Sequence, residues 1–127
     1  MLVLFAGSSL MTDAGFAHHS FAAVYDSEKP ITLHGVVIQV EWLNPHAHFY
    51  VDVQNEDGGV ENWDFELASP NGLMRLGWTR KSLNSGDAVT VEGFVARDGS
   101  RRVNTRSVTM ADGSKMFGGA PVQGGLR

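Results

Sequence analysis

Residues 46–67 read HAHFYVDVQNEDGGVENWDFEL, and this stretch decides the fold. Apolar residues occupy every second position in each half, as in two β-strands that bury one face. Between the halves, Asp57-Gly58 lies in the polar cluster at 54–59 and predicts a hairpin turn. The residues expected to face the core are Ala47, Phe49, Val51 and Val53 in the first strand, and Trp63, Phe65 and Leu67 in the second.

The opposite face of this predicted hairpin is polar and carries two histidines. When both apolar faces point inward, the numbers of paired residues must have an even sum, for example Asp52 with Asp64 or Tyr50 with Glu66. The outer face then gathers His46, His48, Tyr50, Asp52, Asp64 and Glu66.

Upstream, residues 31–42 (ITLHGVVIQVEW) are rich in β-branched residues and predict another strand. Its even-numbered residues, from His34 to Trp42, are expected to face the interior. His34 is therefore predicted to be a buried, hydrogen-bonded histidine rather than a ligand. Gly35 predicts a bulge or a strong bend within this strand.

Downstream, Ser69-Pro70 predicts the start of a short helix that ends at Gly77. Two further strands are expected over 88–96 and 102–110, and residues 110–117 are expected to add a turn and a short strand. Five strands with one short helix between strands three and four predict an all-β fold, a small five-stranded OB-fold-like barrel.

The first 17 residues, MLVLFAGSSLMTDAGFA, have an apolar run followed by small residues and predict a signal peptide cleaved after Ala17. The basic residues that usually precede such a run are missing, which suggests a truncated leader. The apolar run is far shorter than the roughly 20 residues of a membrane-spanning helix. The expected organisation is a leader (1–17), an arm (18–30), a barrel (31–117) and a flexible Gly-rich tail (118–127), in a periplasmic or secreted protein.

Four stretches together resemble a family of small exported bacterial proteins catalogued as domain of unknown function 6152. They are HHSFAAVYD (18–26), VEWLNPHAHFYVDV (40–53), WDFELASPNGLMRLGWTRKSLNSGDAVTVEGF (63–94) and SVTMADGSKMF (107–117). The resemblance implies an exported single-domain protein that starts at or near the histidine pair. It brings no established activity, so the function has to be argued from the residues.

Histidines are the main candidates for chemistry, because the sequence has no cysteine. His46 and His48 leave the same face about 6.5–7 Å apart along the strand. After cleavage, His18 would offer its imidazole and a free α-amino group as a chelate, with His19 as a substitute. Such nitrogen ligands suit Cu(II), and zinc or nickel less well. The alternative is that these histidines simply form a solvated surface.

Other residues could assist this site. Asp52, Asp64 and Glu66 are candidates to orient histidine rings around a metal, or they merely solvate the sheet. Trp42 is a candidate to shield the histidine pair. Together with Trp63 and Trp78, it is more readily explained as core, with a sugar-stacking platform as the alternative.

The expected function is therefore metal carriage or sequestration, without catalytic residues. The alternative is a non-enzymatic binding module for a glycan, a small ligand or an envelope protein. The formal net charge of −4 argues against nucleic acid as a partner, because binding its phosphates requires a basic surface.

Overall fold

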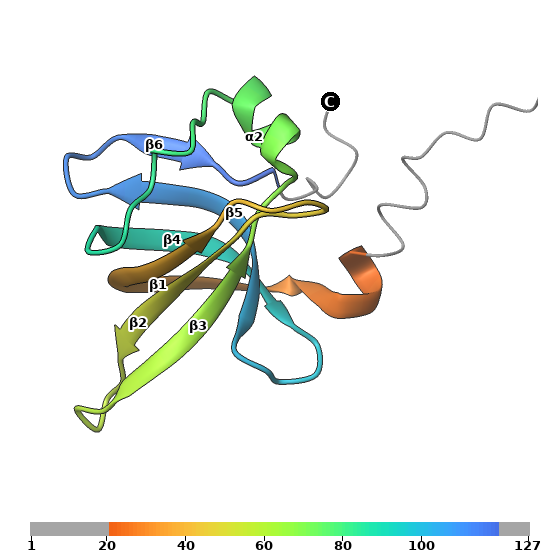
Figure 1. Cartoon of the computed structure of the whole chain (residues 1–127). Coiled ribbons are helices and arrows are strands. Elements are labelled where there is room, and N and C mark those ends of the chain that lie inside the picture. Colours follow the sequence, from red (N-terminus) through yellow and green to blue (C-terminus); the bar gives the residue numbers. More distant parts are fainter. Residues whose placement is uncertain (1–20, 120–127) are drawn as a thin grey trace, which may run out of the picture.

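A computed structural model describes residues 21–119 of the chain, and most of them lie in β-strands (Figure 1). Residues 21–24 form a helical turn before the first strand. The elements that follow are β1 (Tyr25–Glu41), β2 (His48–Gln54), β3 (Val60–Glu66), α2 (Pro70–Arg75), β4 (Ala88–Ala96), β5 (Arg102–Met110) and β6 (Lys115–Phe117).

Five of the strands close into a ring. The sheet order is β3-β2-β1-β4-β5-β6, and a further parallel pairing joins β3 to β5. The short strand β6 is attached outside the ring, beside β5. The expected all-β, OB-fold-like arrangement with one short helix between the third and fourth strands is confirmed.

The β2–β3 hairpin buries the face that its alternation predicts. It pairs His48 with Glu66 and Tyr50 with Asp64, so the even sum is confirmed, but the example pairing is wrong by two residues. The physical reason lies in the turn. The Asn55 side chain accepts hydrogen bonds from the backbone N–H groups of residues 57 and 59, which closes the turn within residues 55–59.

Strand β1 corrects the expectation for residues 31–42. Val37 is buried, whereas Val36 and Ile38 are 45% and 44% exposed. A β-bulge between Val37 and Gln39 inserts one extra residue opposite β2 and shifts the alternation. The even-numbered face is therefore inward only after the bulge, where Val40 and Trp42 pack against the core.

The predictions for two residues before the bulge, His34 and Gly35, need correction. His34 is exposed, not buried, and its Nδ1 atom lies 2.8 Å from Oγ1 of Thr90. Gly35 is not the bulge itself. It lies where β1 passes so close to β2 that a Cβ atom would be 2.2 Å from the carbonyl oxygen of Asp52.

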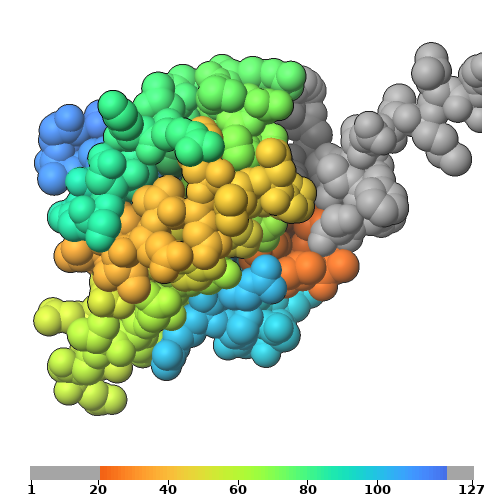
Figure 2. Space-filling view, in the orientation of Figure 1, coloured from red at the N-terminus to blue at the C-terminus, as the bar shows by residue number. Residues whose placement is uncertain are grey.

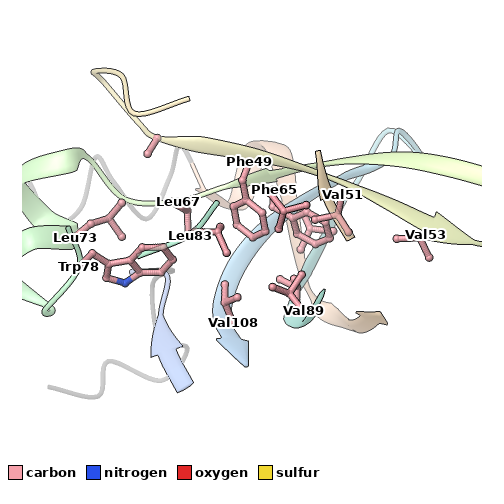
Figure 3. Close-up of a cluster of buried hydrophobic side chains, with 14 residues drawn as sticks. Phe49, Val51, Val53, Phe65, Leu67, Leu73, Trp78, Leu83, Val89 and Val108 are labelled. Atoms are coloured by element: carbon pink, nitrogen blue, oxygen red, sulfur yellow. The ribbon is translucent and has the colours of Figure 1, made fainter. Parts of the chain in front are cut away.

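The core fills the ring and continues under the helix (Figure 3). Phe49 and Phe65 stack at its centre, with ring centroids 5.0 Å apart. Leu73 and Trp78 come from α2 and the segment after it and cover one end of the core. The indole of Trp78 donates a hydrogen bond to the carbonyl oxygen of Phe117. Trp63 is half-buried against the same core.

The segment boundaries differ from the expected ones at both ends. β1 begins at Tyr25, so residues 25–30 of the expected arm belong to the sheet. Gly118 is buried and its N–H donates to the carbonyl oxygen of Arg106, so it is packed rather than part of a loose tail. The expected leader, His18, His19 and residues 120–127 lie outside the described residues.

Candidate histidine–carboxylate site

The outer face of the β2–β3 hairpin brings two histidines into contact with two carboxylates. The Nδ1 atom of His48, on β2, lies 2.8 Å from Oδ1 of Asp64, on β3. The Nδ1 atom of His46 lies 2.5 Å from Oε1 of Glu66. A carboxylate can only accept, so each Nδ1 carries the proton and donates it. This leaves the Nε2 atom of each ring as the nitrogen able to bind a ligand.

The two histidines differ in exposure. His46 lies in the connection between β1 and β2, directly after the cis peptide bond Asn44-Pro45, and its side chain is 51% exposed. The His48 side chain is on the strand itself and is 23% exposed. The apolar residues on either side of His48, Ala47 and Phe49, are fully buried and hold the strand against the core.

Glu66 connects His46 to the N-terminal part of the fold. Its Oε2 atom accepts a hydrogen bond from the hydroxyl group of Tyr25, the first residue of β1. Burial raises the pKa of the Tyr25 phenol well above its usual range, and the hydrogen bond to Glu66 adds to the effect. Tyr25 therefore stays protonated and remains a donor to the carboxylate.

Arg102 lies between the two carboxylates. Its guanidinium nitrogens are 3.8 Å from Asp64 and 3.9 Å from Glu66. The parallel pairing of β3 with β5, which places Arg102 opposite Asp64, brings this cation to the site. One positive charge near both carboxylates reduces the repulsion that two neighbouring anions would otherwise experience.

A second tyrosine lies on the same face. Tyr50 pairs with Asp64, and its hydroxyl group donates to Oε2 of Glu41 at 3.3 Å. The pKa of the Tyr50 phenol is raised, first by desolvation and then by the negative charges of Asp64 and Glu41. This contact joins β2 to the end of β1 on the face that carries the histidines.

The residues predicted to assist the site make different contacts in the structure. Asp64 and Glu66 contact histidine rings, which agrees with the first of the two alternatives expected for them. Asp52 instead accepts a hydrogen bond from Asn62, its partner on β3. Trp42 packs partly against the core and lines a surface hollow.

Sequence reasoning missed Tyr25 and Arg102. Tyr25 was expected in a connecting arm, and it is 41 residues away from Glu66 in the chain. Arg102 is the first residue of the strand that the sequence predicts over 102–110, and no role at the site is predicted for it. Arg102 reaches the site because β3 pairs with β5, which closes the ring and brings the start of β5 beside Asp64. A prediction of this pairing was the only way to find Arg102 from the sequence.

The segment before β1 is held against the β4–β5 hairpin. Arg97 donates from Nε to the carbonyl oxygen of Ala22 at 2.7 Å and from its backbone N–H to the carbonyl oxygen of Val24 at 2.8 Å. The ring of Phe21 packs edge-on against Phe94. Within residues 21–119, no three side chains of His, Asp, Glu or Cys are grouped so that they could hold one metal ion.

Comparison with known proteins identifies the family. A family model described as Family of unknown function (DUF6152) matches residues 8–105. The chain belongs to this family. The DUF6152 match includes both histidine–carboxylate pairs, Tyr25 and Arg102. No curated protein and no solved structure matches the chain. In the described part of this DUF6152 protein, no helix is long and apolar enough to cross a membrane.

Proposed function

We propose that this DUF6152 protein is exported and binds a transition-metal ion, with Cu(II) preferred over zinc or nickel. Its role is carriage or sequestration of the metal rather than catalysis. The observation that carries the proposal is that both His46 and His48 donate Nδ1–H to a carboxylate. In metal sites, such a contact fixes the tautomer and orientation of the ring and increases the basicity of Nε2.

The third ligand is proposed to come from the N-terminus. Cleavage after Ala17 would leave His18 with a free α-amino group beside its imidazole. Phe21, three residues after His18 in the sequence, packs against Phe94 on β4. His19 is the substitute ligand.

The ligand set favours Cu(II). An amine and two or three imidazoles form an all-nitrogen set, and such sets suit tetragonal Cu(II) better than other common divalent ions. The carboxylates of Asp64 and Glu66 are already engaged with the histidine rings, so they would support the ligands rather than bind the ion themselves.

The decisive experiment is a Cu(II) titration of the protein that starts at His18. We expect binding of one Cu(II) per chain. One residue added before His18 should weaken it, because the α-amine is displaced from the chelate. His46→Ala combined with His48→Ala should weaken it as well, and His34→Ala is the matched control, since His34 is exposed but contacts Thr90 instead.

Weak binding that none of these changes alters would contradict the proposal. It would favour the alternative function, a non-enzymatic module that binds a glycan, a small ligand or an envelope protein. Mass spectrometry of the exported protein checks the first residue directly, and a first residue other than His18 would remove the amine chelate from the proposal.

A further inference from the structure

A surface hollow lies at the end of β1, and neither His46 nor His48 lines it. Its walls are the last residues of β1 and the loop that leads into β4, and these segments lie side by side in Figure 2. The volume of about 600 Å³ is within the range of small-molecule sites, roughly 300–1,000 Å³. Its buried floor includes Leu83, and Trp42 forms a half-buried aromatic wall.

The loop that forms one wall is fixed to β1 by hydrogen bonds. The hydroxyl group of Ser85 donates to the carbonyl oxygen of Ile38, and the N–H of Gly86 donates to that of Val37 at 2.7 Å. The N–H of Val37 in turn donates to the carbonyl oxygen of Asp87. The bulged part of β1 therefore holds this loop in place.

Three polar side chains surround the aromatic wall. The carboxylate of Glu41 is oriented by Gln39, which donates to Oε1, and by Tyr50, which donates to Oε2. The side-chain N–H of Asn84 donates to the carbonyl oxygen of Lys81, which leaves its Oδ1 atom as an acceptor. Arg80 forms no ion pair with any residue of the described region.

We propose that this hollow binds a neutral saccharide, with a pyranose ring stacked on Trp42 and its hydroxyl groups bonded to Glu41, Arg80 and Asn84. A pyranose combines an apolar face of C–H groups with hydroxyl groups at its edge, which matches an indole surrounded by donors and acceptors. One carboxylate and one guanidinium line the hollow, so their charges balance and favour a ligand without net charge. The inference uses neither His46 nor His48, so it does not depend on metal binding.

The test is a titration of the metal-free, full-length protein with three neutral trisaccharides, cellotriose, maltotriose and chitotriose, followed by NMR. For at least one of them, we expect shifts of the Trp42 indole and Asn84 amide signals, with a dissociation constant on the order of 1 mM. Trp42→Phe and Arg80→Gln should each weaken this binding, and Trp42→Ala should weaken it at least about tenfold. The matched control is Trp63→Phe, because Trp63 is also a half-buried indole but does not line the hollow.

Absence of shifts with all three sugars at about 50 mM, far above the expected dissociation constant, would overturn the proposal. It would equally be overturned if only a charged probe, such as trigalacturonate, shifted these signals, because that result would identify an ion site. Binding that Trp63→Phe weakens as much as Trp42→Phe would place the sugar elsewhere. Because His46 and His48 stay intact in every variant, failure of this test leaves the metal proposal unaffected.

Discussion

His48 donates its Nδ1–H to Asp64, although the residue directly opposite it in the sheet is Glu66. The contact is diagonal, and it frees Glu66 for His46. The face therefore contains two separate histidine–carboxylate pairs rather than two carboxylates competing for one ring. Diagonal neighbours across a strand pair are within reach of long side chains, so the arrangement needs no distortion of the sheet.

The hydroxyl group of Tyr25 is predicted to position the ring of His46 through Glu66. Tyr25→Phe removes only this hydroxyl, so the Oε2 atom of Glu66 loses its hydrogen bond and keeps only the more distant Arg102 guanidinium, 3.9 Å away. The Glu66 carboxylate can then rotate more freely. In the metal-free protein, ¹⁵N NMR should then show a larger share of the His46 tautomer with the proton on Nε2. Cu(II) affinity should fall about tenfold, the usual effect of losing a residue that supports a metal ligand.

Tyr50→Phe is the control for this prediction, because its hydroxyl group is bonded to Glu41 and not to Glu66. It should leave the His46 tautomer unchanged. An unaltered tautomer in Tyr25→Phe would show that Tyr25 has no positioning role. The NMR measurement gives this answer even if the protein does not bind copper.

Alkaline pH is predicted to destabilise the fold through its two tyrosines. The pKa values of both phenols are raised in the folded protein, for Tyr25 first by burial and then by Glu66. The unfolded chain therefore loses these protons at about pH 10, while the folded chain keeps them. Since the unfolded state then binds fewer protons, the free energy of unfolding should decrease as the pH rises above this value.

Urea unfolding at about pH 8 and about pH 11 measures this effect, since these values bracket the usual tyrosine pKa. The decrease should be smaller in Tyr25→Phe than in the wild-type protein. Lysine ionisation contributes equally to both proteins, so it cancels in the comparison. Equal decreases would mean that Tyr25 ionises in the folded state as it does in the unfolded chain.

Gly35 is predicted to be required for the close approach of β1 to β2. In Gly35→Ala, the new Cβ would lie 2.2 Å from the carbonyl oxygen of Asp52 and 2.6 Å from a methyl group of Val51. The strands would have to separate, and the free energy of unfolding should fall by about 3 kcal/mol.

The matched control is Gly58→Ala in the β2–β3 turn. A Cβ there has open space, but Gly58 has a φ of 81°, so we expect a smaller loss of about 1 kcal/mol. Urea denaturation of both variants gives the comparison. A loss in Gly35→Ala no greater than in Gly58→Ala would contradict the steric argument.

Ser69 is predicted to stabilise the start of α2. Its hydroxyl oxygen accepts a hydrogen bond from the N–H of Gly72 at 3.1 Å. Ser69→Ala should lower the free energy of unfolding by about 1 kcal/mol, and Ser69→Asp should restore most of it because aspartate is also a good N-cap. Thermal unfolding followed by circular dichroism measures both, and an equal loss in the two variants would argue against a capping role.

The sequence predicted the hairpin well because one of its faces is buried and the other is solvated. The alternation from Ala47 to Leu67 therefore had a single consistent interpretation. Prediction from alternation failed for β1, where Val36, Val37 and Ile38 are consecutive apolar residues. Three such residues do not show which of them faces inward, and the bulge that decides this leaves no mark in composition.

For the site, the sequence placed His46 and His48 with Asp64 and Glu66 on one face because alternation alone groups them. It could not assign the partners, since the turn sets the register in steps of two residues. Tyr25 and Arg102 come from segments far away in the chain and meet the site only when the ring closes. The contributions of His18 and His19 stay predictions.

The bulge in β1 also matters because this long strand pairs with two different strands along its length. Residues 30–36 pair with β4, and residues 36–41 pair with β2. The extra residue therefore lies just after the point where β1 changes its pairing partner. Each portion thus keeps its own phase of inward and outward side chains. Ile38 is the unpaired extra residue. If it paired with β2 in a regular register instead of bulging, Glu41 would be turned toward the interior and the indole of Trp42 toward water.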